Sequence, residues 1–276
     1  MKPILFLTDF SENAFNAMQY AVAMLSDTKC KFHILTVEEP SNYLTGRLLS
    51  ATPGSSIYDT VFKENKEKQL ELIDNLQKSF PKNQHSFETH VKFSDFENSI
   101  KEIIEQEKIE LLFMGATGTS NLEESLFGSS TLRVINNVPI STLVVPKNYT
   151  YQPIKAVLFS EHKEDDLPSK PLDSLRFILK KFEPALHVLQ INEADEDKNA
   201  ETENILENTS LQFLSYKMHY LNGIPTPQAI QAFTQLFDVQ LHALFLKKES
   251  FIERFIYGSK NAGHRYKTNL PLLILK

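Results

Sequence analysis

Gly115-Ala116-Thr117-Gly118 is the most informative segment of this sequence, together with Gly128-Ser129-Ser130, which follows it after nine further residues. An apolar run, Ile-Glu-Leu-Leu-Phe-Met at 109–114, precedes it and predicts a buried strand, while 131–135 has the pattern of a helix start. A strand that ends in glycines before a helix is how α/β proteins hold phosphates, because backbone N–H groups and the helix N-terminus supply partial positive charge. The stretch therefore predicts an α/β sheet with an anion-binding loop.

Composition places the chain among globular proteins and excludes several partners. It has 276 residues, 41% hydrophobic and 23% charged, which leaves room for two domains. The net charge of −6 argues against nonspecific binding to nucleic acid or to an anionic membrane. The one cysteine, Cys30, forms no intrachain disulfide, and no apolar run is long enough to cross a bilayer. Since the N-terminus also lacks the pattern of a signal peptide, a cytoplasmic location is the simplest interpretation.

The second half of the chain repeats the first. Four apolar segments recur in the same order, and the final pair keeps a proline before its last strand. The pairs are 4–9 with 157–161, 33–39 with 187–193, 112–114 with 244–246, and 138–146 with 270–275. Strand and helix patterns alternate between these segments, which favours parallel sheets with helices on both faces. We predict two tandem open five-stranded sheets related by a pseudo-two-fold axis, with domains at 1–147 and 154–276.

The motifs of the first half resemble those of the universal stress protein family. The pattern Gly-x2-Gly-x9-Gly-Ser after Met114 resembles the nucleotide loop of that family, and 4–14 and 137–146 resemble its opening and closing segments. The resemblance covers 1–147 well and the remainder weakly. It implies a Rossmann-like fold of the adenine nucleotide α-hydrolase type and one bound ATP or related adenine nucleotide, with or without Mg²⁺.

The resemblance also implies a set of nucleotide-binding residues. Asp9 and the backbone near Val37 are expected to hold the adenosine part, and Thr8 to flank the base. Gly115 and Gly118 are expected to line the path of the ribose and phosphates, and the Gly-Ser-Ser segment at 128–130 to bind the phosphates. The full predicted set is Thr8, Asp9, Phe10, Val37, Met114, Gly115, Gly118, Gly128, Ser129, Ser130 and Thr131.

Several of these residues also have a purely structural interpretation. Gly118 and Gly128 could serve a tight turn that needs positive φ, and Asp9 could merely start a helix. Ser129 and Ser130 could cap the following helix as well as bind an anion. The loop contains no lysine or arginine, but it does contain Glu123 and Glu124. Arg133 is the nearest cation, and an arginine at this place is usually a solvated helix residue.

The second half is predicted to have lost this site. Leu-Lys-Lys-Glu at 246–249 takes the place of the first glycines, and Asp9 becomes Glu161. Bulky side chains there block close approach of the backbone, which predicts one ligand per chain. We expect the last strand, 272–275, to pair with 140–145, because this closes an exposed sheet edge. The sequence leaves a homodimer open.

Three functions remain compatible with these patterns. The first is a universal stress protein that binds an adenine nucleotide and acts as a stress-response regulator or scaffold. The second is an interaction scaffold that binds no nucleotide and whose glycine loop is structural. The third is an enzyme with at most slow ATP hydrolysis or nucleotidyl transfer, for which only Asp9, Glu123 or Glu124 could supply a general base or metal ligand. The sequence predicts no catalytic or metal-binding residues, and His33 and His187 are expected to be packing residues.

Overall fold

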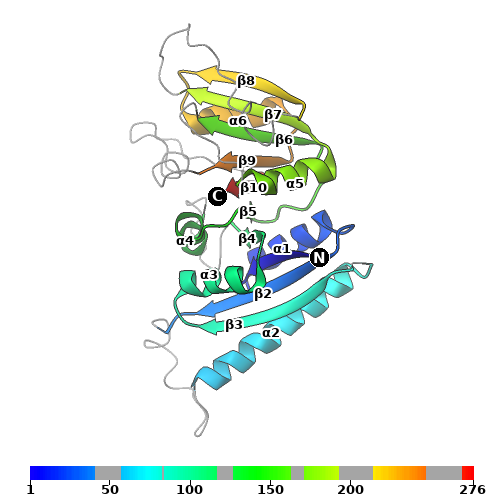
Figure 1. The fold of residues 1–276 in the computed structure, drawn as a ribbon, viewed down its shortest axis with the longest axis vertical. Helices are drawn as coiled ribbons and strands as arrows, with labels where there is room; N and C mark the ends of the chain where they lie inside the picture. The colour runs from blue at the N-terminus through cyan, green and yellow to red at the C-terminus, as the bar shows by residue number, and fades with distance from the viewer. Residues whose placement is uncertain (41–56, 83, 117–126, 163–170, 193–213, 247–268) are drawn as a thin grey trace. The chain divides into compact units, whose positions relative to one another are not determined.

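The computed structural model describes residues 1–40, 57–82, 84–116, 127–162, 171–192, 214–246 and 269–276, and strands and helices alternate strictly in the first half of the chain (Figure 1). The elements of the first half are β1 (Lys2–Leu7), α1 (Glu12–Met24), β2 (Cys30–Glu38), α2 (Ile57–Ser79), β3 (Ser86–Phe93), α3 (Phe96–Glu107), β4 (Leu111–Gly115), α4 (Ser129–Asn137) and β5 (Thr142–Val145). Those of the second half are β6 (Ala156–His162), α5 (Leu172–Phe182), β7 (Ala185–Asn192), β8 (Tyr216–Asn222), α6 (Thr226–Leu236), β9 (Leu241–Phe245) and β10 (Leu272–Leu275).

Strand β1 lies between β2 and β4 and is parallel to both. Leu5 is opposite His33 on β2 and opposite Leu112 on β4, and β3 pairs in parallel with the outer side of β2. The chain therefore runs outward from β1 through β2 to β3 and then crosses back to β4. The order of the strands reverses between β1 and β4, and ligands of open α/β sheets bind at such a reversal.

The second half repeats this arrangement around β6. Strand β6 pairs in parallel with β7 and β9, β8 lies beyond β7, and β10 lies parallel to β9. The predicted α/β class with parallel strands is confirmed. Strand β5 pairs antiparallel with β10, with Leu143 opposite Leu273, so the predicted pairing of these two segments is confirmed as well.

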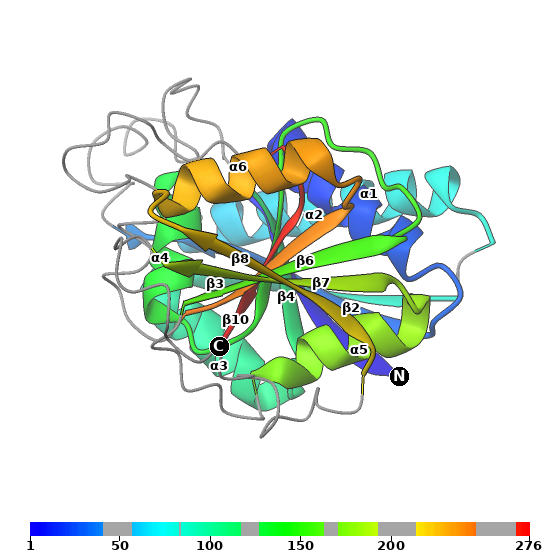
Figure 2. The same ribbon diagram turned by 90° about the horizontal axis from the view of Figure 1, so that it is seen from above.

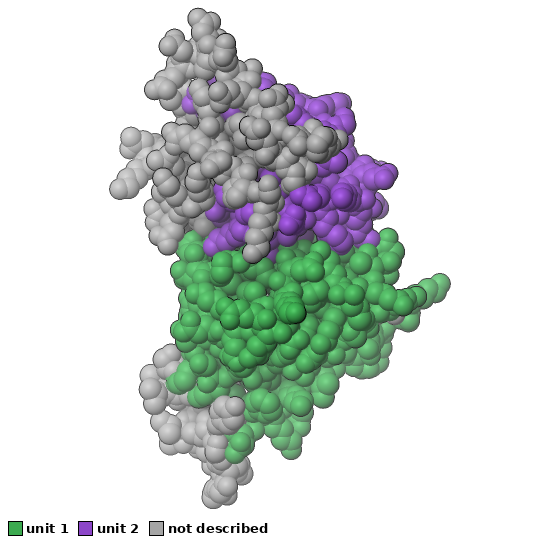
Figure 3. Space-filling view, in the orientation of Figure 1, with its two compact units in different colours: residues 1–123, 127–140, 147–151 green, residues 124–126, 141–146, 152–276 purple. Residues whose placement is uncertain are grey.

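The chain divides into two compact units, coloured in Figure 3. The first comprises 1–123, 127–140 and 147–151, and the second comprises 124–126, 141–146 and 152–276. Strand β5 thus groups with the second unit, where β10 covers its backbone groups. None of the helices in the described parts of the chain is both long and apolar enough to span a membrane.

Helices cover both faces of the strands of the first unit (Figure 2). Helices α1 and α2 contact each other on one face, and α3 and α4 contact each other on the other face. The core between sheet and helices contains a cluster of rings: Phe6 stacks on Phe32 at 4.7 Å between centroids and meets the edge of Phe113 at 6.1 Å. All three side chains are fully buried, and their apolar area is a main source of the stability of this unit.

The start of α1 packs unusually close to the end of β4. A Cβ atom placed on Gly115 would lie 2.9 Å from the carbonyl oxygen of Asn13, inside the distance that real Cβ contacts show. Because a backbone carbonyl at a helix start has little freedom to move, only glycine fits here. Gly115 therefore has a packing role that holds the site's two main segments together.

We expect Gly115→Ala to reduce the free energy of unfolding by about 1–3 kcal/mol, because the added methyl group pushes α1 away from β4. Urea denaturation followed by circular dichroism measures the change. Ser129→Ala, at an exposed position, is the control and should leave the midpoint unchanged. An unchanged midpoint for Gly115→Ala would contradict the packing role.

Candidate functional site

A cavity of about 390 Å³ opens at the carboxyl ends of β1, β2 and β4 in the first unit. It lies at the reversal of strand order described above, where ligands of this fold class bind. Its size is within the range of small-molecule sites. The residues that line it are Leu7, Thr8, Asp9, Phe10, Ser11, Ala14, Leu35, Thr36, Val37, Glu38, Glu39, Phe96, Met114, Gly115, Ser130, Thr131 and Arg133.

The turn from β1 to α1 forms one wall of this cavity. Thr8 Oγ1 accepts a hydrogen bond from the Phe10 N–H at 3.0 Å, and Asp9 Oδ1 accepts one from the Ser11 N–H at 3.0 Å. Ser11 caps α1 by accepting from the Ala14 N–H at 3.2 Å. These bonds hold Phe10 at φ 63°, a left-handed conformation that bulky residues rarely adopt. The turn therefore presents the exposed Asp9 carboxylate at the edge of the cavity in a fixed position.

The N-terminus of α4 forms the facing wall. Gly128 is the N-cap residue, and it has no side chain with which to cap the helix. Ser129 and Ser130 are its first two residues, so the expectation that they cap it is wrong. Gly128 has φ −67°, so it does not need the positive φ of a tight turn. The first N–H groups of a helix have no intrahelical acceptor, so those at the start of α4 can bond an anion in the cavity.

A threonine fixes the start of α4 against the end of β4. The buried Thr131 hydroxyl donates to the carbonyl oxygens of Gly115 and Ala116, each at 3.1 Å. The Gly128 N–H also donates to the Ala116 carbonyl, at 2.8 Å. These bonds set the direction in which the helix N-terminus points, although the residues between them, 117–126, lie outside the described part of the chain.

The structure brings most of the predicted residues together. The cavity is lined by Thr8, Asp9, Phe10, Val37, Met114, Gly115, Ser130 and Thr131. Gly128 and Ser129 do not line it, although they stand beside residues that do. Gly118 lies outside the described residues, as do Glu123 and Glu124.

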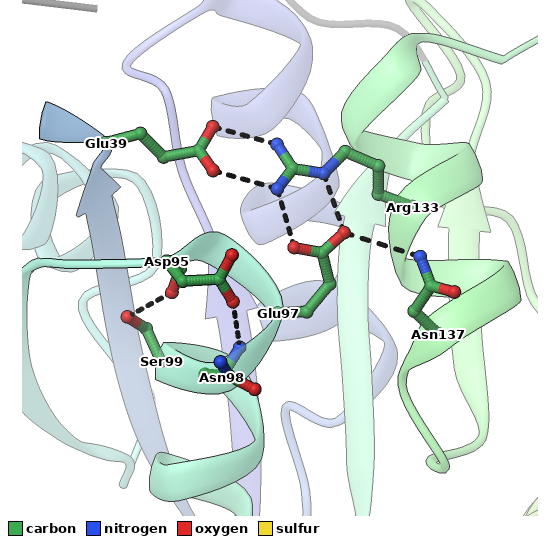
Figure 4. A network of polar contacts seen from close by, with 7 residues as sticks. All are labelled: Glu39, Asp95, Glu97, Asn98, Ser99, Arg133 and Asn137. Atoms are coloured by element: carbon green, nitrogen blue, oxygen red, sulfur yellow. Dashed lines mark hydrogen bonds and ion pairs between the residues drawn. The ribbon is translucent and has the colours of Figure 1, made fainter. Parts of the chain in front are cut away.

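Arg133 is the residue that sequence reasoning missed at this site (Figure 4). Its guanidinium donates two hydrogen bonds to the Glu39 carboxylate, both at 2.8 Å, and two to Glu97, at 2.8 and 2.6 Å. It also lies over the Phe96 ring, 4.7 Å from the centroid. Both carboxylates are thus bound in the bidentate manner that suits the planar guanidinium. The expected solvated arginine is instead the centre of a network that closes one side of the cavity.

This network shifts the ionisation of its members. Hydrogen bonds from Arg133 lower the pKa of Glu97 to about 2, and they also hold the pKa of Glu39 below its ordinary value. The same bonds raise the pKa of Arg133. Glu39, Asp95 and Glu97 present carboxylate oxygens close to one another, and the single guanidinium is bonded to two of them while its charge offsets only one. The two glutamates come from the end of β2 and the start of α3. Their spacing in the sequence does not predict that both contact Arg133 on α4.

The part of the chain that forms this cavity is similar to known proteins. The model of the universal stress protein family matches residues 1–146, which is more than half of the chain. The chain belongs to the universal stress protein family. A universal stress protein of Methanocaldococcus jannaschii is 26% identical over 146 residues, which are 53% of this chain and 82% of that protein.

Solved structures share the fold along the whole chain. A universal stress protein from Archaeoglobus fulgidus matches with a TM-score of 0.68 and 18% identity, over 99% of this chain and 96% of that chain. The cytoplasmic domain of a prokaryotic cation chloride cotransporter matches with a TM-score of 0.52 and 11% identity, over 99% and 94%. At these identities the likeness concerns the fold alone.

Strand register corrects the expected alignment of the two halves. Ile4 on β1 is opposite Leu111, and Val157 on β6 is opposite Leu241. The last residue of β4, Gly115, therefore corresponds to Phe245, the last residue of β9. By the same register Asp9 corresponds to His162 and not to Glu161. A phenylalanine stands where the first half has the glycine that allows the close approach of α1.

We predict that the Glu97 ion pair makes stability fall in acid. The pKa of Glu97 is lowered in the folded chain, so its contribution is complete above pH 4.5 and is lost as the pH falls towards about 2. Urea denaturation at a series of pH values should show a smaller acid-induced loss for Glu97→Gln than for the wild type. Glu105→Gln, an exposed residue of the same helix, is the control and should follow the wild type. Equal slopes for Glu97→Gln and the wild type would contradict the role assigned to the network.

Proposed function

We propose that the chain binds one adenine nucleotide, ATP or a related one, in this cavity and acts as a nucleotide-dependent regulator or scaffold in the stress response of the cytoplasm. In this proposal, residues 1–147 are the nucleotide-binding domain and 154–276 are a degenerate second copy. The observation that carries the proposal is the cavity at the reversal of strand order, whose lining includes both the first turn of α4 and the Asp9 carboxylate.

The lining of the cavity suits the parts of a nucleotide. Leu35, Val37 and Met114 offer apolar surface for a flat base. The exposed Asp9 carboxylate can accept hydrogen bonds from ribose hydroxyls. The backbone N–H groups at the start of α4, next to the Ser130 hydroxyl, can donate to phosphate oxygens.

The acidic residues around the cavity favour a nucleotide whose phosphates carry little negative charge. Among the lining residues, Asp9, Glu38 and Glu39 are acidic, and Arg133 is the one cation. Arg133 is already bonded to two carboxylates, so it offers little net positive charge to a polyphosphate. Backbone dipoles must then hold the phosphates, and we expect ATP to need Mg²⁺ where AMP does not.

A scaffold without a nucleotide is the second candidate, and one observation favours it. The packing of Gly115 against Asn13 explains this glycine without any ligand. The two candidates differ in a simple property, because a scaffold of this kind keeps the same melting temperature whatever adenine nucleotide is added.

The first test places a charge at the anion-binding end of the cavity. AMP, ADP and ATP, each with and without Mg²⁺, should raise the melting temperature of the wild type by mass action. Ser130→Asp should abolish these shifts, because a carboxylate at this lining position repels phosphate. An acidic residue in a first helical turn does not disfavour the helix, so the variant should remain folded.

Ser129→Asp is the matched control for this experiment. It adds the same charge to the same exposed helical turn, but at a position that does not line the cavity. It should keep most of the nucleotide-induced shift. No shift in the wild type with any of the nucleotides, and no nucleotide released when the purified protein is denatured for mass spectrometry, would sink the proposal.

A second prediction concerns Asp9. In Asp9→Asn the side-chain oxygen can still accept from the Ser11 N–H, so the turn is kept while the charge and one acceptor are lost. We expect the Kd for AMP to rise about tenfold, the loss of roughly one charged hydrogen bond. Isothermal titration calorimetry measures this. An unchanged Kd would remove Asp9 from the binding residues.

A further inference from the structure

Each half of the chain contains a pair of histidines at the same place in its sheet. His33 on β2 and His90 on β3 have ring nitrogens, Nδ1 and Nε2, 2.9 Å apart. His187 on β7 and His219 on β8 have the same two nitrogens 3.0 Å apart. In each pair the second histidine lies two residues beyond the register partner of the first. Both pairs are therefore hydrogen-bonded across adjacent parallel strands at equivalent positions.

The first pair has a carboxylate beside it. Glu107, the last residue of α3, places its Oε2 atom 3.8 Å from His33 Nδ1. The donor atoms of His33, His90 and Glu107 all lie within 4.8 Å of one another. We propose that these three residues, from β2, β3 and α3, form a binding site for one divalent transition-metal ion of the kind that imidazole and carboxylate ligands select, with Zn²⁺ as its model.

The distances are close to those of a bound ion. Ligand atoms around a tetrahedral Zn²⁺ stand about 3.3 Å apart, given Zn–N and Zn–O bonds of about 2.0–2.2 Å. The observed separations of 2.9 and 3.8 Å lie on either side of this value. The ring centroids are 5.2 Å apart, so the two nitrogens point at each other across a shared hydrogen. The ion would lie beside this N–N line on the Glu107 side, and each ring would turn by roughly 35° so that both nitrogen lone pairs point at the ion.

The protonation balance of the site is simple. Burial lowers the pKa of both His33 and His90, so both rings are neutral at neutral pH. When the ion binds, the shared hydrogen moves to the other nitrogen of its ring, and both rings remain neutral ligands. His33 then carries its hydrogen on Nε2, which is buried and has no hydrogen-bond partner in the described structure. Lack of such an outer-shell partner weakens metal sites about 10- to 100-fold, so we expect micromolar rather than nanomolar affinity.

The neighbouring Lys31 does not need the Glu107 carboxylate as its partner. Lys31 Nζ lies 3.7 Å from Glu107 Oε2, but its shorter contact, 2.6 Å, is with Glu88. Lys31 can therefore remain paired with Glu88 when Glu107 binds the ion. The Glu107 side chain is 27% exposed, which gives the ion a path from solvent.

The second half supplies a natural comparison. Glu107 stands four residues before the first residue of β4, and Phe237 stands four residues before the first residue of β9. The Phe237 ring lies 5.0 Å from His187 and 5.1 Å from His219, between centroids. Phe233 packs against the same two histidines. An aromatic ring thus takes the place of the carboxylate, and this second pair should not bind the ion.

Zn²⁺ is titrated into the metal-free, untagged full-length chain by isothermal titration calorimetry. We expect one Zn²⁺ per chain in the wild type and a Kd at least tenfold higher in Glu107→Gln. His219→Asn, the matched change in the second pair, should leave the first site's Kd and stoichiometry unchanged. Phe237→Glu, at a half-buried position, should raise the stoichiometry to two. Circular dichroism checks that each variant is folded.

Two results of the Zn²⁺ titration would overturn the proposal. They are a wild type that binds no Zn²⁺ and a Kd that Glu107→Gln leaves unchanged. Loss of binding in a folded His219→Asn chain would move the site to the second half and would also overturn it. Co²⁺ gives an independent check, because its visible absorption should change on binding to the wild type and not to Glu107→Gln.

Discussion

Strand β1 pairs in parallel with β2 on one side and with β4 on the other, and this double pairing decides where a ligand can enter the first unit. Parallel neighbours require crossover connections, and the connections that follow β1 and β4 run in opposite directions, the first towards β2 and the second away from it. The turn after β1 and the segment after β4 therefore separate at the carboxyl edge of the sheet. The cavity forms in that gap, between the turn at 8–11 and the start of α4.

Two short-range contacts make this gap a defined site. Gly115 lets the start of α1 approach the end of β4, and Thr131 bonds the carbonyl oxygens at the end of β4. Both contacts involve backbone atoms, which have little freedom to adjust. Arg133 then joins the end of β2 and the start of α3 to α4 through Glu39 and Glu97. The polar wall of the cavity carries a net negative charge, because one guanidinium offsets only one of the two carboxylates that it binds, and this leaves backbone dipoles as its main source of positive potential.

The two halves show how one backbone plan carries different chemistry. Strand order and the histidine pairs are repeated, but Phe245 stands in the position of Gly115, and Phe237 in that of Glu107. An aromatic residue thus stands at each of these positions, where the first half has a close backbone contact or a carboxylate. Large rings can maintain a buried core at such positions. The second half has the same strand pairing as the first but not its glycine and glutamate at these two positions.

The α/β class, the repeat of apolar segments, the buried strand before the glycines and about half of the residues that line the cavity could be predicted from the sequence. Apolar periodicity and glycine spacing are local properties, and parallel strand ends bring such segments to one edge without further information. The cap of α1 is also local in the sequence, because Ser11 accepts from the N–H of Ala14, only three positions on. The bidentate pairing of Arg133 with Glu39 and Glu97 and the meeting of His33, His90 and Glu107 emerged only from the tertiary structure. These contacts join residues far apart in sequence, and their partners follow from strand register and helix docking, which no spacing along the chain encodes.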